Sequence, residues 1–207
     1  MATYGPGIQR PAPVSTASAL SLSVLIGLSM FLLDWTSKSL AVQILGESLI
    51  PLGVLSLGVV YNDAFAFSSG SGLVHPHTVA LIRLLGVALA TFLFFRLYHL
   101  SRRVSVGFAF LIAGGAGNTA DVLFRDGAVI DFIGTGPFTF LIAGEPLDIH
   151  FVFNLADVWA VIGLILLWPL IRQFGNAFNA RVQRFERRFL ARVKAVFTRR
   201  LPARIMQ

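Results

Sequence analysis

The segment FVFNLADVWAVIGLILLWPLI, residues 151–171, is apolar at almost every position and carries two strongly polar residues, Asn154 and Asp157. A membrane-spanning helix needs about 20 predominantly apolar residues, so this segment predicts one. The two polar residues are three positions apart near the start of the segment and therefore share one face of the predicted helix. Because an ionisable side chain within a span is costly, the pair indicates a functional site at one end of a membrane helix.

Three further segments have the length and apolarity of membrane spans, namely residues 14–33, 78–97 and 104–120. The last of them contains a run of Gly and Ala at 113–117, which is typical of close helix packing. Together the four segments predict an all-α membrane protein in which residues 14–171 form one membrane domain. Its two longer connections, 46–77 and 121–150, lie on one side of the membrane.

The composition agrees with a membrane protein. Hydrophobic residues make up 56% of the 207 residues and charged residues 13%, whereas a soluble domain carries about 25% charged residues. The mean hydropathy of +0.76 excludes a disordered chain, which needs low hydrophobicity. The absence of cysteine excludes a disulfide scaffold, a thiolate metal site and a cysteine nucleophile.

The positions of the basic residues predict the orientation of the chain. Of the 17 Lys and Arg residues, 14 precede the first span, lie at the turn between the second and third spans, or follow the fourth. Cytoplasmic segments are enriched in Lys and Arg, so both termini are predicted to be cytoplasmic. Nine of the ten acidic residues lie between Asp34 and Asp157, which places most of the negative charge in the spans and the outer connections.

The two ends of the chain have patterns of their own. Residues 1–13 contain three prolines and are interpreted as a flexible lead. Residues 172–207 alternate aromatic or aliphatic residues with arginines at three- and four-residue steps, which predicts a basic amphipathic helix. Such a helix is expected to lie on the anionic inner leaflet. The net charge of +7 is therefore attributed to membrane contact, and no nucleic-acid partner is expected.

Polar residues of the spans gather at one depth. With a rise of 1.5 Å per residue, the polar positions of the first, third and fourth spans all fall near the outer ends of those helices. Further polar residues lie in the outer connections. Arg83, about six residues inside the second span, is expected to snorkel outward or to pair with an acid. The outer group comprises Asp34, Asn62, Asp63, Asn118, Asp121, Asp126, Asp131, Asn154 and Asp157.

Two carboxyl groups held close together share a proton, because both cannot ionise at once. One then acts as a base toward water and the other as an acid, which is the chemistry of an aspartyl peptidase. Asp131 and Asp157 are the natural pair, the first expected on a mobile outer segment and the second on a fixed helix. A serine nucleophile is a weaker alternative, since Ser68, Ser69 and Ser71 lack an evident base, although His75 or His77 could serve. No metal is expected.

Five short motifs follow one another along the chain. They are Asp34-Trp-Thr-Ser-Lys38, Asn62-Asp-Ala-Phe-Ala-Phe67-Ser68, Gly117-Asn118-Thr-Ala-Asp121, Val129-Ile130-Asp131-Phe132-Ile133 and Phe153-Asn154-Leu155-Ala156-Asp157. In this order they resemble the motifs of the lipoprotein signal peptidases (signal peptidase II), a family of four-span aspartyl peptidases. Each motif alone is a weak signal, whereas five in order on a four-span background are a strong one.

The resemblance implies a monomeric enzyme of the bacterial cytoplasmic (inner) membrane, without a cofactor, in which Asp131 and Asp157 are catalytic. It implies a diacylglyceryl-modified prolipoprotein as substrate, cleaved just before the lipidated cysteine. It also implies a small extracytoplasmic β-structure in the 46–77 connection, where the β-branched residues of Val54–Tyr61 favour a strand. The residues that would bind substrate or brace the site are Asp34, Lys38, Asn62, Asn118, Asp121 and Asn154.

The chain departs from the family pattern at several places. Val122 stands where the family has Arg, and Arg125, one turn further, is expected to supply that charge or the contact is absent. Ala64 and Phe65 replace a Gly-Ala pair, and the interval between Asp131 and Asp157 is longer than expected. These departures affect the expected substrate range more than the chemistry.

Two other functions compete with the peptidase. A proton-coupled transporter needs acids across the whole membrane, and the inner halves of the spans carry almost none. A non-catalytic lipoprotein-binding or assembly protein derived from the peptidase would not need to retain both Asp131 and Asp157.

Overall fold

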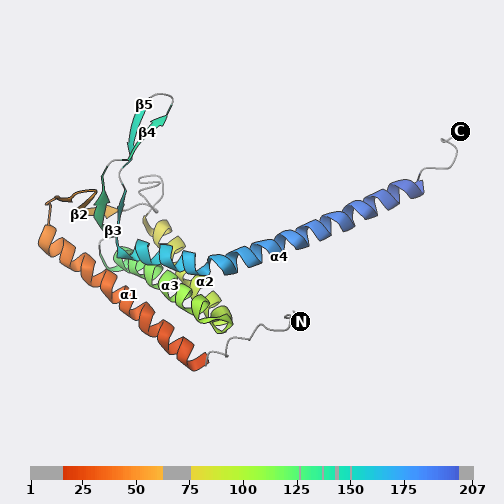
Figure 1. Ribbon diagram of the computed structural model, residues 1–207, viewed down its shortest axis with the longest axis horizontal. Helices are drawn as coiled ribbons and strands as arrows, with labels where there is room; N and C mark the ends of the chain where they lie inside the picture. Colours follow the sequence, from red (N-terminus) through yellow and green to blue (C-terminus); the bar gives the residue numbers. More distant parts are fainter. Residues whose placement is uncertain are drawn as a thin grey trace, which may run out of the picture. The chain divides into compact units, whose positions relative to one another are not determined.

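The computed structural model describes residues 16–62, 76–125, 127–136, 138–142, 145–149 and 151–200 (Figure 1). These residues include four long helices, each long and apolar enough to cross a membrane, so the predicted four-span fold is confirmed. A 3-10 turn, η2 (Tyr98–Leu100), links the second helix to the third. The long helices are α1 (Thr16–Leu45), α2 (Pro76–Leu97), α3 (Arg102–Phe124) and α4 (Leu155–Arg200).

Two helix boundaries differ from those predicted. The span 14–33 is extended by about three turns, because α1 continues to Leu45 and places Lys38 within the helix. The hydroxyl groups of Thr36 and Ser39 donate to helix carbonyls four residues earlier, so these polar residues continue the helix. At the other end of the site, α4 begins at Leu155 and not near Phe151, because a short strand precedes it.

Helix α3 lies against α1 and α2 and packs closely on the first turns of α4 (Figure 1). A Cβ atom added at Gly114 would lie 2.9 Å from the backbone nitrogen of Ala160, and one added at Gly163 would lie 2.7 Å from that of Leu111. Only small residues allow two helix backbones to approach so closely. The prediction that the 113–117 run serves helix packing is therefore confirmed for Gly114.

A four-stranded antiparallel sheet joins the two longer connections between the helices. It contains β1 (Ile50–Leu52), β2 (Leu55–Asn62), β3 (Val129–Thr135) and β6 (Val152–Phe153), in the order β1-β2-β3-β6. A separate hairpin consists of β4 (Phe138–Ile142) and β5 (Glu145–Ile149). The strand expected at Val54–Tyr61 is confirmed as β2.

The 121–150 connection, in contrast, is richer in strands than the sequence predicts. Asp131 was expected on a mobile outer segment, yet it lies in β3, opposite Val60 of β2. Asn62 pairs with Val129 in the same register, so Asn62 and Asp131 are diagonal neighbours on one face of the sheet. The strand could not be recognised locally, because its pairing partner lies about 70 residues earlier in the chain.

The chain divides after Leu167 into two compact units, and the second begins at Trp168. The described part of the second unit is helical to Arg200, as predicted for a basic amphipathic tail. Its apolar side chains recur at three- and four-residue steps and are exposed, with arginines at the positions between them. The exposed apolar residues of this helix include Phe174, Phe178, Val182, Phe185 and Phe189.

We predict that Gly114→Ala destabilises the protein, because the added methyl group would overlap the carbonyl oxygen of Ala156. Overpacking of this kind typically costs about 1–3 kcal/mol. Thermal unfolding in detergent, followed by circular dichroism, measures the effect. Gly86→Ala is the matched control, since a Cβ there meets nothing within 4 Å. Equal midpoints for the two variants would contradict the close packing of α3 on α4.

Candidate active site

The site contains a buried ion cluster around Lys38. Its Nζ atom lies 2.8 Å from Oδ2 of Asp34 and 2.7 Å from Oδ2 of Asp121, and none of the three side chains is exposed to solvent. The same ammonium group donates to Oδ1 of Asn118 at 2.9 Å. The ammonium group thus contacts three oxygen atoms, one each from Asp34, Asp121 and Asn118.

The two carboxylates of this cluster also hold the elements that carry Asp131 and Asp157. Oδ1 of Asp34 accepts a hydrogen bond of 2.8 Å from the backbone N–H of Ala156, in the first turn of α4. Oδ2 of Asp121 accepts one of 3.3 Å from the backbone N–H of Ile130 in β3. The N–H groups at the start of a helix lack partners within the helix and favour a negative charge, so Asp34 anchors α4 at its N-terminus.

Arg125 completes the cluster. Its Nη1 atom lies 3.4 Å from Oδ1 of Asp121, while Nη2 donates to the carbonyl oxygen of Trp35 and to Oγ of Ser39. The guanidinium also stacks over the Trp35 ring, 3.8 Å from its centroid, in a cation–π contact. Val122 therefore does not leave the family's contact absent: of the two alternatives, Arg125 supplies a charge to Asp121 from one turn later.

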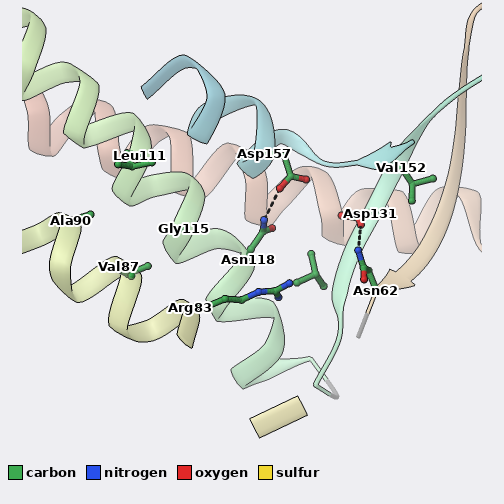
Figure 2. Close-up of a pocket in the computed structure, with 12 residues that line it drawn as sticks. Asn62, Arg83, Val87, Ala90, Leu111, Gly115, Asn118, Asp131, Val152 and Asp157 are labelled. Carbon is green, nitrogen blue, oxygen red and sulfur yellow. Dashed lines mark hydrogen bonds between the residues drawn. The ribbon is translucent and has the colours of Figure 1, made fainter. Parts of the chain in front are cut away.

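Next to this cluster, two carboxyl groups accept hydrogen bonds from asparagine amides (Figure 2). Asp131, 3% exposed, accepts hydrogen bonds from Nδ2 of Asn62 at 3.0 Å and from Nδ2 of Asn154 at 2.6 Å. Asp157 accepts one of 2.9 Å from Nδ2 of Asn118. Asn154 also donates to Oδ1 of Asn118, so a single amide network joins both carboxyl groups.

The spacing of Asn154 and Asp157 is explained by the start of α4. Oδ2 of Asp157 accepts from the backbone N–H of Asn154 at 3.1 Å, and the backbone N–H of Asp157 donates to Oδ1 of Asn154 at 3.2 Å. This reciprocal pair is a capping box, which satisfies two N–H groups at the helix start. The same three-residue spacing thus begins the helix and orients the Asp157 carboxylate.

Both carboxyl groups line a cavity of about 320 Å³ (Figure 2). Its polar part contains the two acids with Asn62 and Asn118, and Arg83 enters it from α2. Its apolar walls come from α2 and α3 and consist of Gly86, Val87, Ala90, Leu111 and Gly115, with Val129 and Val152 from the strands.

Burial raises the pKa of Asp131 to about 6. The hydrogen bonds from Asn62 and Asn154 act in the opposite direction, since they stabilise the ionised form, and the negative charge of Asp157 raises the pKa further. Near neutral pH this carboxyl group can therefore exist in either protonation state. That property is required of a group that both donates and accepts a proton.

The structure brings all eight residues singled out in the sequence into one connected site: Asp34, Lys38, Asn62, Asn118, Asp121, Asp131, Asn154 and Asp157. The structure also places Arg83 in the cavity lining and brings Arg125 into contact with Trp35 and Ser39. Helical spacing alone does not indicate these contacts. The alternative nucleophiles Ser68, Ser69 and Ser71, the possible base His75 and the side chain of His77 lie outside the described residues. Among the described residues, no group of three or more His, Asp or Glu side chains could hold a metal ion.

Comparison with known proteins relates this arrangement to one family. Residues 26–172 match a family model described as Peptidase_A8, signal peptidase (SPase) II. The chain is 31% identical over 181 residues to a lipoprotein signal peptidase of Leifsonia xyli subsp. xyli (strain CTCB07), covering 83% of this chain and 76% of the relative. It is 38% identical over 150 residues to one of Synechococcus sp. (strain RCC307), covering 70% and 90%.

The fold is also similar to that of a bacterial membrane enzyme solved by the in meso method at 2.3 Å resolution. The TM-score is 0.57 at 21% sequence identity, with 76% of this chain and 92% of the other covered.

We predict that Lys38→Met strongly destabilises the protein, because it leaves the buried carboxylates of Asp34 and Asp121 without their shared cation. Removing one partner of a buried ion pair typically costs about 3–5 kcal/mol. Unfolding in detergent measures the change. Arg172→Met, which removes an exposed cation, should have little effect. A Lys38→Met protein as stable as that control would show that the cluster contributes little to the fold.

Proposed function

The chain belongs to the signal peptidase II family, and from this premise we propose that it removes the signal peptide of diacylglyceryl-modified prolipoproteins, cleaving just before the lipidated cysteine. Asp131 and Asp157 are the catalytic residues of this proposal and are called the dyad below. The observation that supports it is the amide network that holds two carboxyl groups at one cavity.

The proposed reaction is the hydrolysis of one peptide bond. The Asp157 carboxylate takes a proton from water while the water oxygen attacks the scissile carbonyl carbon, and Asp131 gives its proton to the carbonyl oxygen. The resulting gem-diol collapses as Asp157 passes its proton to the leaving nitrogen and Asp131 recovers one from a hydroxyl group. The C–N bond breaks, and the dyad returns to its starting state with one proton.

Preorganisation supports this assignment. Each carboxyl group is oriented by side-chain amides that are themselves fixed, so neither needs to be rearranged when substrate binds. The Asn154 amide contacts Asp131 directly and Asp157 through Asn118. Replacement of water by fixed dipoles in a cavity of this kind strengthens the electrostatic interactions on which proton transfer depends.

The apolar part of the cavity suits the proposed substrate. Gly86, Val87 and Ala90 of α2 face Leu111 and Gly115 of α3 across it. A signal peptide is apolar next to its cleavage site, and the acyl chains of the substrate keep that site at the membrane surface. The non-catalytic alternative, a lipoprotein-binding or assembly protein, shares this cavity and differs in not requiring both acids.

We predict that Asp131→Asn and Asp157→Asn each lower the turnover of a diacylated prolipoprotein by at least roughly a hundredfold, because general acid–base catalysis contributes about that much or more. Both variants should remain folded, since the amide has the shape of the carboxyl group and its oxygen still accepts one of the two hydrogen bonds that each acid accepts. Glu186→Gln, which removes an exposed acid from the tail, is the matched control. Full cleavage by either dyad variant would exclude the two-aspartate mechanism, and no cleavage by the wild-type chain would favour the binding protein.

We also propose that the protein lies in the bacterial cytoplasmic membrane as a monomer, with both termini in the cytoplasm. The tail helix supports contact with the anionic inner leaflet, because its exposed phenylalanines alternate with Arg181, Arg184, Arg187 and Arg188. Aromatic side chains enter the interface while arginines bind lipid phosphates.

The absence of natural cysteine makes this orientation directly testable. Ser48→Cys should react with a membrane-impermeant maleimide in intact spheroplasts, because Ser48 is exposed after α1 on the proposed outer side. Ser101→Cys and Gln183→Cys, also at exposed positions, should react only after the membrane is opened. The opposite labelling pattern would reverse the proposed topology.

A further inference from the structure

The charges of the buried cluster around Lys38 balance one another. Lys38 contacts both Asp34 and Asp121, and Arg125 makes a second contact with Asp121. Two carboxylates therefore face two cations. The cluster is therefore neutral as a whole, although the Lys38 charge also favours the ionised form of Asp131.

The cavity itself contains three charged residues, Asp131, Asp157 and Arg83. A pair of carboxyl groups that shares one proton has a net charge of −1. Arg83 has a charge of +1, so the three together are neutral when the dyad holds a single proton. Below that proton count the cavity is left with an excess negative charge, and above it with an excess positive charge.

The position of Arg83 is set by α2. Arg83, Gly86, Val87 and Ala90 follow helical spacing and line the cavity together. Arg83 lies seven residues after the first residue of α2, about 10 Å along the helix axis, within a candidate membrane span. A cation at that depth is costly unless an anion stabilises it. Figure 2 shows its side chain extending from α2 across the cavity.

Two carboxyl groups of the site, those of Asp131 and Asp157, line the same cavity as Arg83. The sequence allowed that Arg83 either snorkels outward or pairs with an acid. Its place in the cavity lining favours the acids.

We propose that Arg83 is the counter-ion of the dyad: its charge favours the state in which Asp131 and Asp157 together hold one proton. The proposal rests on the proposed function for its catalytic meaning, but not for its electrostatics. Arg83 is a positioning residue in this scheme, since it acts through the two carboxyl groups and takes no part in bond making.

The other groups around Asp131 are known, so the effect of Arg83 can be isolated. Asn62 faces Asp131 from β2 and Asn154 from the residue before α4, while Asp157 of α4 and Lys38 of α1 act on it through their charges. A substitution of Arg83 changes only the charge that α2 places at the cavity. Loss of a nearby cation makes ionisation less favourable, so the pKa of Asp131 should rise.

The experiment compares wild type, Arg83→Leu and Arg83→Lys in detergent, with infrared titration of the protonated-carboxyl band. Asp131→Asn identifies the contribution of Asp131 to the band. We expect a midpoint near 6 in the wild type, an upward shift of roughly one pH unit in Arg83→Leu, and little shift in Arg83→Lys. The high-pH limb of the kcat/KM profile should move in the same direction.

Arg96→Leu is the matched control, because it removes the same charge from the same helix about 20 Å further along and should leave the midpoint unchanged. If Arg83→Leu does not fold, Arg83→Gln removes the charge while keeping a hydrogen-bonding side chain. An unshifted or lowered midpoint in the folded neutral variant would overturn the counter-ion. A shifted midpoint in a chain that cleaves no prolipoprotein would support the counter-ion and refute the proposed function.

Discussion

A single buried ammonium group holds the parts of this site together. Lys38 lies about two turns before the end of α1, where it forms ion pairs with Asp34 on the same helix and Asp121 on α3 and donates a hydrogen bond to Asn118 on α3. Those partners are bonded in turn to the first turn of α4, to β3 and to Asp157. Because the group is fully buried, these contacts cannot be exchanged for water, and the arrangement of three helices and a strand depends on them.

Close helix packing is the second condition for this arrangement. Gly117 faces the carboxylate of Asp34 and the methyl group of Ala156, and Gly114 faces the backbone of α4. Larger residues would separate α3 from α4 and stretch the hydrogen bond between Asn118 and Asp157. The small residues thus serve the chemistry indirectly, since they set the distance across which the asparagine amides act.

Neighbouring residues and helices bond the backbone groups that α4 itself leaves without partners. Its first turn is capped by Asn154 and Asp157, and its Ala156 N–H group donates to Asp34. Further along, Pro169 has no N–H to offer the carbonyl of Ile165, and Arg103 of α3 donates to that oxygen at 3.3 Å. The N–H group of Ala156 is therefore bonded to α1, and the carbonyl group of Ile165 is bonded to α3.

The sequence by itself determined the four spans and the depth of the polar residues, because hydropathy and a rise of 1.5 Å per residue are local properties. It also identified the eight residues of the site by their motifs. It could not show that Asp131 lies in a strand, since β3 is formed by pairing with β2 about 70 residues away, nor that Arg83 lines the same cavity as both acids. Only the tertiary structure decided which carboxylates share Lys38, which amide holds each member of the dyad, and which cation faces them. Those relations depend on side chains that meet across four helices and a sheet, and spacing along one helix contains no information about them.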